Sequence, residues 1–352
     1  MARPIVQMCS KTENSTGGKQ MKVTGPCPEN VMSRAVYKQL HKHRTDVKRC
    51  LSERYPAVAA MPSESNSNGR LILKSETLTG RAAHIGQMLA DRVAAQILAA
   101  GAVPMYMTLA VLMPVDVEEQ ELRVLIHELE AACERYQTDL LDVQVNVTEA
   151  VNQMTVTMTG AGFGVVVPET KAQEGDALVM IGYAGYAGAA CIADVKAAQL
   201  HERYHPDFID KAADYLKTVS LAEQIALLQK MPEDSIHQIT VCGEQGVFGA
   251  LWQLARIADV GFEVDLKKIL LKQQIVEICD YFDINPYMLE SQGAMLVCTN
   301  RGEALTELLE AAGYEAAVIG YIKSGHDKCI VNDDEVRYLD MPKGSEIVKA
   351  QL

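Results

Sequence analysis

The sequence is short of basic side chains, and this deficit narrows the class of protein before any motif is considered. Lysine and arginine number 33 against 46 aspartate and glutamate residues, which gives a net charge of −13 over 352 residues. Such a balance disfavours non-specific binding to nucleic acid or to an anionic membrane. A hydrophobic fraction of 48% and a charged fraction of 22% are typical of a globular protein. The length suffices for two domains.

Signals for export and for paired cysteines are also missing. Residues 1–20 are polar and rich in Gly and Ser, without the charged, apolar and small-residue regions of a signal peptide, and we expect a mobile tail there. The nine cysteines include no C-x-x-C pair. In a chain without an export signal they are interpreted as reduced, mostly buried thiols. Together these absences predict a cytoplasmic protein.

One uncharged run has the length of a membrane span. Val93–Val115 contains no Lys, Arg, Asp or Glu. Gly101 and Pro104 would break a helix in the middle of this run, and its Ala-rich first half is only weakly apolar. A buried helix, a turn and a strand at Met105–Met113 are therefore predicted, without membrane association.

Helix and strand patterns alternate on both sides of Pro168–Gly175, whose polar turn residues indicate a linker. We therefore predict an α+β protein of two domains, residues 21–168 and 175–345. In the first domain we expect a helix from Pro28 to Cys50, a loop at Met61–Arg70, a strand at Leu71–Leu73, a helix at Val117–Tyr136, and strands at Leu140–Val147 and Gln153–Val167. In the second we expect strands at Ala177–Ile181, Ile236–Val241, Ala294–Thr299 and Ala316–Ile322, with helices at Tyr186–Leu200, Gly249–Ala258, Leu270–Asp280 and Glu303–Ala312.

A glycine-rich turn, Gly182–Gly188, follows a predicted strand and opens a helix. Its G-x-x-G-x-x-G spacing is neither that of a phosphate-binding Walker loop nor that of a dinucleotide fingerprint. Gly182, Gly185 and Gly188 would let the backbone approach a ligand, and the helix N-terminus would offer N–H groups to an anion. Tight packing of strand against helix is the alternative interpretation.

A second glycine-rich turn, Gly243–Gly249, precedes the helix that contains Trp252. Gly243 and Gly246 are candidate ligand contacts for the same reason, and Phe248 adds an apolar side chain. Here too, close packing of the backbone is the alternative.

Histidines give weaker indications. His41, His43 and Cys50 could form a metal cluster, but their spacing does not place them together on one helix face, so a solvated helix face is the preferred interpretation. His201 and His205 flank a helix junction, where capping or hydrogen bonding to the backbone is expected.

The order of these features resembles the AIR synthase-related family, which includes the hydrogenase maturation factor HypE, selenophosphate synthetase and thiamine-monophosphate kinase. The resemblance rests on Asp91–Met113, the glycine-rich turns, Ile284–Gly293, and Ala317–Ile322 with a hairpin-like pair ending at Asp340. It spans residues 22 to 342, and HypE is the member most similar. It implies two α+β domains with a nucleotide such as ATP in the cleft between them. It also implies a homodimer whose first-domain sheets combine and hide Met105–Met113 from water.

The resemblance aligns two positions of the first domain with acidic residues of the family. The family's Thr-Asp-Ser matches Ser75–Thr77, so Glu76 keeps a carboxylate on a side chain one methylene longer. The family's Asn-Asp pair, whose Asp helps to hold magnesium on ATP, matches Ala95 and Gln96.

A third position changes in the same way. The family's Gly-Asp-Thr-x-Val strand matches Val143–Val147, which puts Gln144 in place of an Asp and Asn146 beside it. Magnesium prefers carboxylates and phosphate as ligands, so two neutral amides in place of two acids predict a degraded magnesium site. The resemblance thus implies nucleotide binding by Glu76, Gln96, Gln144, Asn146 and the glycine-rich turns, with magnesium-dependent ATP turnover absent or weak.

HypE carries its reacting group on a cysteine at the end of a Pro-Arg-Ile-Cys tail. This sequence has no cysteine after Cys329, so chemistry by that route would lack its nucleophile. Three hypotheses stay open: a divergent family member that binds a nucleotide or small ligand, an ATP-dependent enzyme with altered chemistry in the same cleft, and a non-catalytic partner of a maturation or metabolic assembly.

Overall fold

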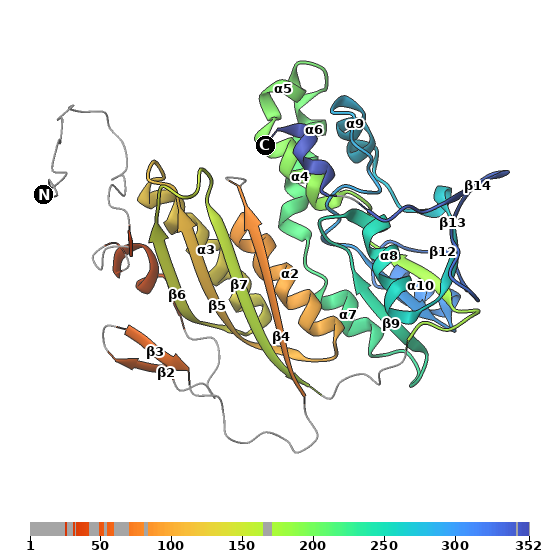
Figure 1. The fold of residues 1–352 in the computed structure, drawn as a ribbon, viewed down its shortest axis with the longest axis horizontal. Helices are drawn as coiled ribbons and strands as arrows, with labels where there is room; N and C mark the ends of the chain where they lie inside the picture. The colour runs from red at the N-terminus through yellow and green to blue at the C-terminus, as the bar shows by residue number, and fades with distance from the viewer. Residues whose placement is uncertain are drawn as a thin grey trace, which may run out of the picture.

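The computed structural model describes residues 25–26, 31, 33–41, 49–52, 55–59, 70–80, 84–164, 171–342 and 344–351. Two large sheets, each packed against helices, form the two halves of the molecule (Figure 1). The predicted α+β fold of two domains is confirmed, while its boundaries stay predictions. The tail at residues 1–20, the loop at 61–69 and the linker residues 168–170 lie outside the described residues. Within the described parts, no helix is long and apolar enough to cross a membrane.

The first sheet has five strands in the order β1-β6-β5-β7-β4. All neighbours are antiparallel except β5 and β6, and α3 connects this parallel pair. The elements are β1 Gly25–Pro26, β4 Arg70–Thr79, α2 Ile85–Ala99, β5 Val103–Met113, α3 Glu119–Tyr136, β6 Asp139–Val147 and β7 Thr155–Gly164.

Helices α2 and α3 cover one face of this sheet, and no helix of the described residues covers the other, which we call the open face (Figure 1). In β5, Met107, Leu109 and Val111 are buried beneath the helices, whereas Thr108 and Leu112 are exposed on the opposite face. Successive side chains of a strand point to opposite faces, so half of the apolar strand is already hidden within one chain. Within one chain the helices hide one face of this strand, and the expected burial of its other face by a dimer stays a prediction.

The predicted helix from Pro28 to Cys50 is wrong in its second half. The described part holds a short π-helical turn, η1 (Ser33–Tyr37), and then strand β2 (Arg49–Ser52) paired with β3 (Tyr55–Ala59). Buried Val31, Ala35 and Val36 pack into the first-domain core, and Leu40 is the last apolar residue of that stripe. Beyond it the chain offers no continuous apolar face that would hold a longer helix against the core.

The second sheet has seven strands in the order β14-β13-β10-β12-β8-β11-β9, with one parallel pair, β10 and β13. Its strands are β8 Ala177–Ile181, β9 Ile236–Val241, β10 Gly261–Asp265, β11 Met295–Thr299, β12 Ala316–Lys323, β13 Lys328–Asn332 and β14 Glu335–Tyr338. The helices are α4 Tyr186–Val195, α5 Ala197–His201, α6 Pro206–Ala213, η2 Asp214–Thr218, α7 Ala222–Leu228, α8 Gly246–Ala258, η3 Leu266–Lys268, α9 Gln273–Tyr281, α10 Gly302–Ala311 and η4 Glu346–Ala350. The predicted helix Tyr186–Leu200 is thus two helices, α4 and α5.

Helix α2 belongs to the cores of both domains. Val93 and Ile97 pack in the first-domain core, whereas Ala95 packs against α7 and the second sheet. Polar contacts reinforce this junction: the hydroxyl of Tyr136 donates to Asp91 on α2, at 2.8 Å, and lies 2.7 Å from the hydroxyl of Ser220 in the second domain. One helix therefore fixes how the two domains face each other.

Candidate functional site: a cleft between the domains

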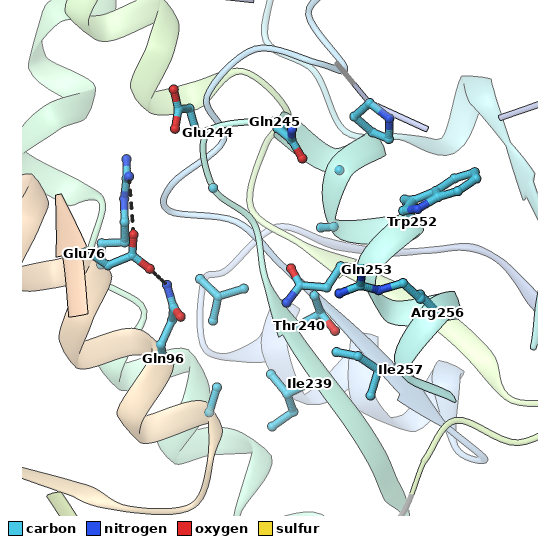
Figure 2. A pocket seen from close by; sticks show the side chains of 18 of the residues that line it. Glu76, Gln96, Ile239, Thr240, Glu244, Gln245, Trp252, Gln253, Arg256 and Ile257 are labelled. Carbon is cyan, nitrogen blue, oxygen red and sulfur yellow. Dashed lines mark hydrogen bonds and ion pairs between the residues drawn. The ribbon is translucent and has the colours of Figure 1, made fainter. Parts of the chain in front are cut away.

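A cleft of about 740 Å³ separates α2 and β4 of the first domain from β9 and α8 of the second (Figure 2). The first-domain wall consists of Lys74, Glu76, Arg92, Gln96, Ala99 and Ala100. The facing wall includes Ile239–Val241, Gly243–Gly246, Gly249, Ala250, Trp252, Gln253, Arg256 and Ile257, and Met341, Pro342, Gly344 and Ser345 complete it. The predicted cleft between the domains is thus present and holds polar groups from both.

The carboxylate of Glu76 is the centre of the first-domain wall. Gln96 donates a hydrogen bond of 2.6 Å to its Oε1, and Lys74 Nζ lies 3.1 Å from the same oxygen. Arg92 Nη1 lies 4.0 Å from Oε2. One carboxylate therefore has two cations and one amide around it. Figure 2 shows the amide of Gln96 directed at Glu76.

Arg92 also connects the domains through a buried ion pair. Its Nη2 donates to Glu290 Oε2 at 2.7 Å, and both side chains are nearly inaccessible to water. Gln292 accepts a 3.3 Å hydrogen bond from Arg92 Nε and donates to the carbonyl of Met88 at 2.7 Å. Burial raises the pKa of Glu290, and Arg92 opposes that rise because it favours the ionised carboxylate.

On the facing wall, a tight turn leads from β9 into α8. Gly246 has φ of +67°, and a Cβ there would lie 2.4 Å from the carbonyl oxygen of Tyr287, so only glycine fits. Gly243 has no atom within 4 Å of a Cβ position and meets no such limit. Thr240 is buried, and Gln245 is exposed to the cleft.

Helix α8 presents its polar residues to the cleft. Gln253 and Arg256 are exposed, and Trp252 is half-buried beside them (Figure 2). Lys328 Nζ lies 5.0 Å from the centre of the Trp252 ring, within the range of a cation–π contact. This wall combines an aromatic surface, neutral amides and one guanidinium group.

Four of the nine predicted contact residues line this cleft: Glu76, Gln96, Gly243 and Gly246. Gln144 and Asn146 do not. They lie on β6, three strands from Glu76 on β4, which is about 14 Å at the usual spacing of strands. Gln144 is exposed on the open face, whereas Glu76 faces α2. A single chain therefore does not bring Gln144 to Glu76 and Gln96 as the aligned motifs implied.

The turn Gly182–Gly188 does not line the cleft either, and the N–H groups of its three glycines are already engaged. The N–H of Gly182 donates to the carbonyl of Glu315, that of Gly185 to Ser291 Oγ, and that of Gly188 to the carbonyl of Glu290.

Steric contacts at these glycines also favour a role in packing over a role in ligand binding. A Cβ would lie 2.3 Å from a backbone oxygen at Gly182 and 2.5 Å from Leu289 at Gly188. The geometry supports the packing interpretation, because an anion would find these three donors occupied.

The histidines of the sequence analysis form no metal site in the described residues, where no three His, Cys, Asp or Glu side chains are grouped for metal binding. His43 and the Cys50 side chain lie outside the described residues. His201 Nε2 lies 3.2 Å from Asp210 Oδ1, and His205 precedes α6 without a capping bond from its side chain. The capping expected of these two histidines is therefore corrected.

The described cysteines carry no sign of nucleophilic chemistry. Cys133, Cys191, Cys242, Cys279 and Cys298 are buried, and Cys329 is half-buried. Burial raises the pKa of Cys191 and Cys279 to about 12, which keeps both thiols protonated at neutral pH.

Comparison with known proteins agrees with the two-domain fold. The N-terminal-domain model of AIR synthase related proteins matches residues 59–166, and the C-terminal-domain model matches residues 173–332. A protein of Methanocaldococcus jannaschii named for hydrogenase expression and formation is 21% identical over 274 residues, which cover 75% of this chain and 78% of that protein.

Two crystal structures of the hydrogenase maturation protein HypE are similar in fold. The Escherichia coli protein has a TM-score of 0.70 at 15% identity, with 91% of this chain and 97% of that chain covered. HypE in complex with ATP has a TM-score of 0.69 at 15% identity, with 91% and 96% covered. With both domain models matched, and with the order of strands and helices around an interdomain cleft, this chain belongs to the AIR synthase-related proteins and is close to HypE.

Proposed function

We propose that this protein binds a nucleotide or a similar small ligand in the interdomain cleft and turns over little or no ATP with magnesium. The observation that carries the proposal is the environment of Glu76, whose carboxylate is held by Lys74 and Gln96 within the cleft. The complex of HypE with ATP supports a nucleotide as the ligand class.

The same environment argues against a strong magnesium site. Magnesium needs several oxygen ligands in near-octahedral geometry, and carboxylates usually supply part of that set. Here Glu76 has two cations close to its oxygens, and Gln96 and Gln144 stand where the family resemblance aligns acidic ligands. A divalent cation would have to displace Lys74 and compete with Arg92.

Thermal-shift measurements on the full chain test this proposal. A ligand that binds only the native state raises the melting temperature. We expect ATP or another adenine nucleotide to raise it in EDTA as well as in magnesium, and ATP hydrolysis to stay near background. No shift with any nucleotide would refute the proposal.

We also propose that a terminal cysteine takes no part in the chemistry of these 352 residues. Cys329 does not line the cleft. The segment 344–351 packs against the second domain: Glu346 accepts a hydrogen bond from the backbone N–H of Asn285, and Lys349 donates to the carbonyl of Asp283. A cytoplasmic location, inferred from nine cysteines without a C-x-x-C pair, belongs to the same proposal.

A homodimer through the open face of the first sheet completes the proposal. Leu73 is 63% exposed on β4 and Leu112 is 38% exposed on β5, among threonines of β4, β5 and β7. A flat face of small and apolar side chains suits two-fold self-association. Light scattering on the purified chain at micromolar concentration tests it, and a monodisperse monomer would refute it.

A further inference from the structure

The charges of the cleft are nearly balanced. Two of its cations, Lys74 and Arg92, are matched by Glu76 and by the buried Glu290. Arg256 has no ion-pair partner in the part of the chain that the structure describes. The cleft therefore has one guanidinium group available to neutralise a ligand.

Glu244 adds a negative charge to the cleft, opposite in sign to that of Arg256. It is exposed on the turn before α8 and lies away from Arg256 in the view of the cleft (Figure 2). A chain of phosphates would place several negative charges near Glu76 or Glu244, with Arg256 as the only uncommitted cation of the described lining. Like charges at short distance disfavour such a ligand, and no carboxylate cluster is present among the described residues to recruit a metal ion instead.

Neutral hydrogen-bonding side chains outnumber charged ones on the facing wall, with Thr240, Gln245 and Gln253 against Glu244 and Arg256. The side-chain amides of Gln245 and Gln253 have no hydrogen-bond partner among the described residues and border the cleft with Thr240. A carboxamide both donates and accepts, which suits the polar edge of a planar heterocycle. Trp252 offers an aromatic surface for its face.

The spacing along α8 suits one kind of ligand. Trp252 and Arg256 are four residues apart, which is about 6 Å along a helix axis. That rise is similar to the separation between the base and the 5′-phosphate of a nucleotide. Both side chains line the same cleft.

Building on the proposed function, we infer that the preferred ligand is a nucleoside monophosphate rather than a triphosphate. Its base meets Trp252 and the amide of Gln253, and its single phosphate pairs with Arg256. No metal ion is required, because one guanidinium group and hydrogen bonds supply the complement to one phosphate.

Fluorescence of Trp252, the only tryptophan of the chain, reports on this site in the intact protein. Adenosine, AMP, ADP and ATP are titrated in EDTA and in magnesium chloride. We expect AMP to bind about tenfold more tightly than ATP in EDTA, and magnesium to change AMP affinity by less than about twofold. Tightest binding of ATP with a requirement for magnesium would overturn the inference and leave the proposed function standing. Failure of every nucleotide to bind would overturn both.

Two arginine variants locate the phosphate. Arg256→Gln is expected to weaken AMP binding about tenfold and to leave adenosine binding unchanged, since adenosine carries no phosphate. Arg301→Gln is the matched control, because Arg301 is exposed ahead of α10 and does not line the cleft. An equal loss of adenosine and AMP in Arg256→Gln, or no loss of either, would overturn the placement of the phosphate at Arg256.

Discussion

The side-chain amide of Gln96 donates a 2.6 Å hydrogen bond to the carboxylate of Glu76 and so joins helix α2 to strand β4 at the wall of the interdomain cleft. Lys74 lies 3.1 Å from the same carboxylate oxygen. The side-chain amide of Gln96 and the ammonium group of Lys74 thus lie beside the carboxylate of Glu76, which is the one acid kept among the positions that the family resemblance aligns with acidic residues.

Restoring an acid at this place should create a magnesium requirement. In Gln96→Asp a second carboxylate would stand near Glu76, and two oxygen ligands favour a divalent cation over Lys74. We expect the thermal shift caused by ATP to become larger in magnesium than in EDTA for Gln96→Asp, and to differ little between the two for the parent. A parent protein with strong magnesium-dependent turnover that persists in Glu76→Gln would contradict this account.

The buried pair of Arg92 and Glu290 should control stability. Arg92→Ala leaves Glu290 buried without its cation, which costs about 3–5 kcal/mol in comparable buried pairs. Urea unfolding followed by circular dichroism measures this loss. The double variant Arg92→Met with Glu290→Leu should recover much of it, because no buried charge is left unpaired. Equal stability of the parent and Arg92→Ala would show that water or another group replaces the arginine.

The cost of Arg92→Ala should depend on pH. Burial raises the pKa of Glu290 in the folded protein above its ordinary value, and Arg92 limits that rise. Because this pKa is higher in the folded than in the unfolded protein, protonation of Glu290 stabilises the fold. The stabilisation is complete at pH values below the unfolded-state pKa of about 4.5, and it is lost as the pH rises through the folded-state pKa. Without Arg92 the rise is larger, so the stability deficit of the variant should shrink from pH 8 toward about pH 5. A constant deficit over this range would contradict the assignment. Asp91 and Glu128, whose pKa values burial also raises, are present in both proteins and cancel from the comparison.

Two glycines separate a packing role from a role in the cleft. Gly185 has φ of +70°, and its Cβ position lies 2.9 Å from Ile275, so Gly185→Val should lose about 1–3 kcal/mol of stability. Gly243→Ala meets no neighbouring atom within 4 Å and should change stability by less than about 0.5 kcal/mol, yet it adds a methyl group to the cleft wall. Thermal unfolding and nucleotide titration of both variants distinguish the roles. A Gly185→Val protein of parental stability with weakened ligand binding would restore the anion site first predicted for that turn.

The open face of the first sheet should tolerate a charge in the monomer but not in the proposed dimer. Leu112→Lys places an ammonium group at the centre of that face, where it would be buried by a partner copy. We expect light scattering to show a dimer for the parent and a monomer for Leu112→Lys. Val195→Lys is the control, since Val195 is 43% exposed at the end of α4. A dimer that survives Leu112→Lys must use another surface.

Several elements could be predicted from local patterns because their physical causes are local. The strands β8 and β9 were predicted with the bounds observed, since turn residues lie on both sides of each segment. The fully apolar character of β8 also matches its place inside the second sheet. Strand β10 (Gly261–Asp265) was missed: Phe262 and Val264 alternate with Glu263 and Asp265, but the run is only five residues long, and the strand forms through pairing with β12 and β13.

The residues of the candidate site likewise include some that the sequence predicts and some that only the tertiary structure reveals. Glu76, Gln96 and the turn at Gly243–Gly246 follow from the sequence, because each belongs to a short motif that aligns with the family. Arg92 was not predicted, since its partner Glu290 lies 198 positions away and is brought near only by the docking of α2 between the domains.

The sequence alone determined the type of fold, since apolar periodicity and turn residues act over a few positions. The family was predicted from the resemblance of several motifs in their order along the chain. The tertiary structure decided which of the aligned residues share a cavity. It placed Gln144 on the face of the sheet opposite the helices and engaged the N–H groups of Gly182, Gly185 and Gly188 in hydrogen bonds within the protein. It also placed Trp252 and Arg256 in the lining of the cleft. Their position depends on how the two domains pack against α2, and that packing is made by residues far apart in the chain.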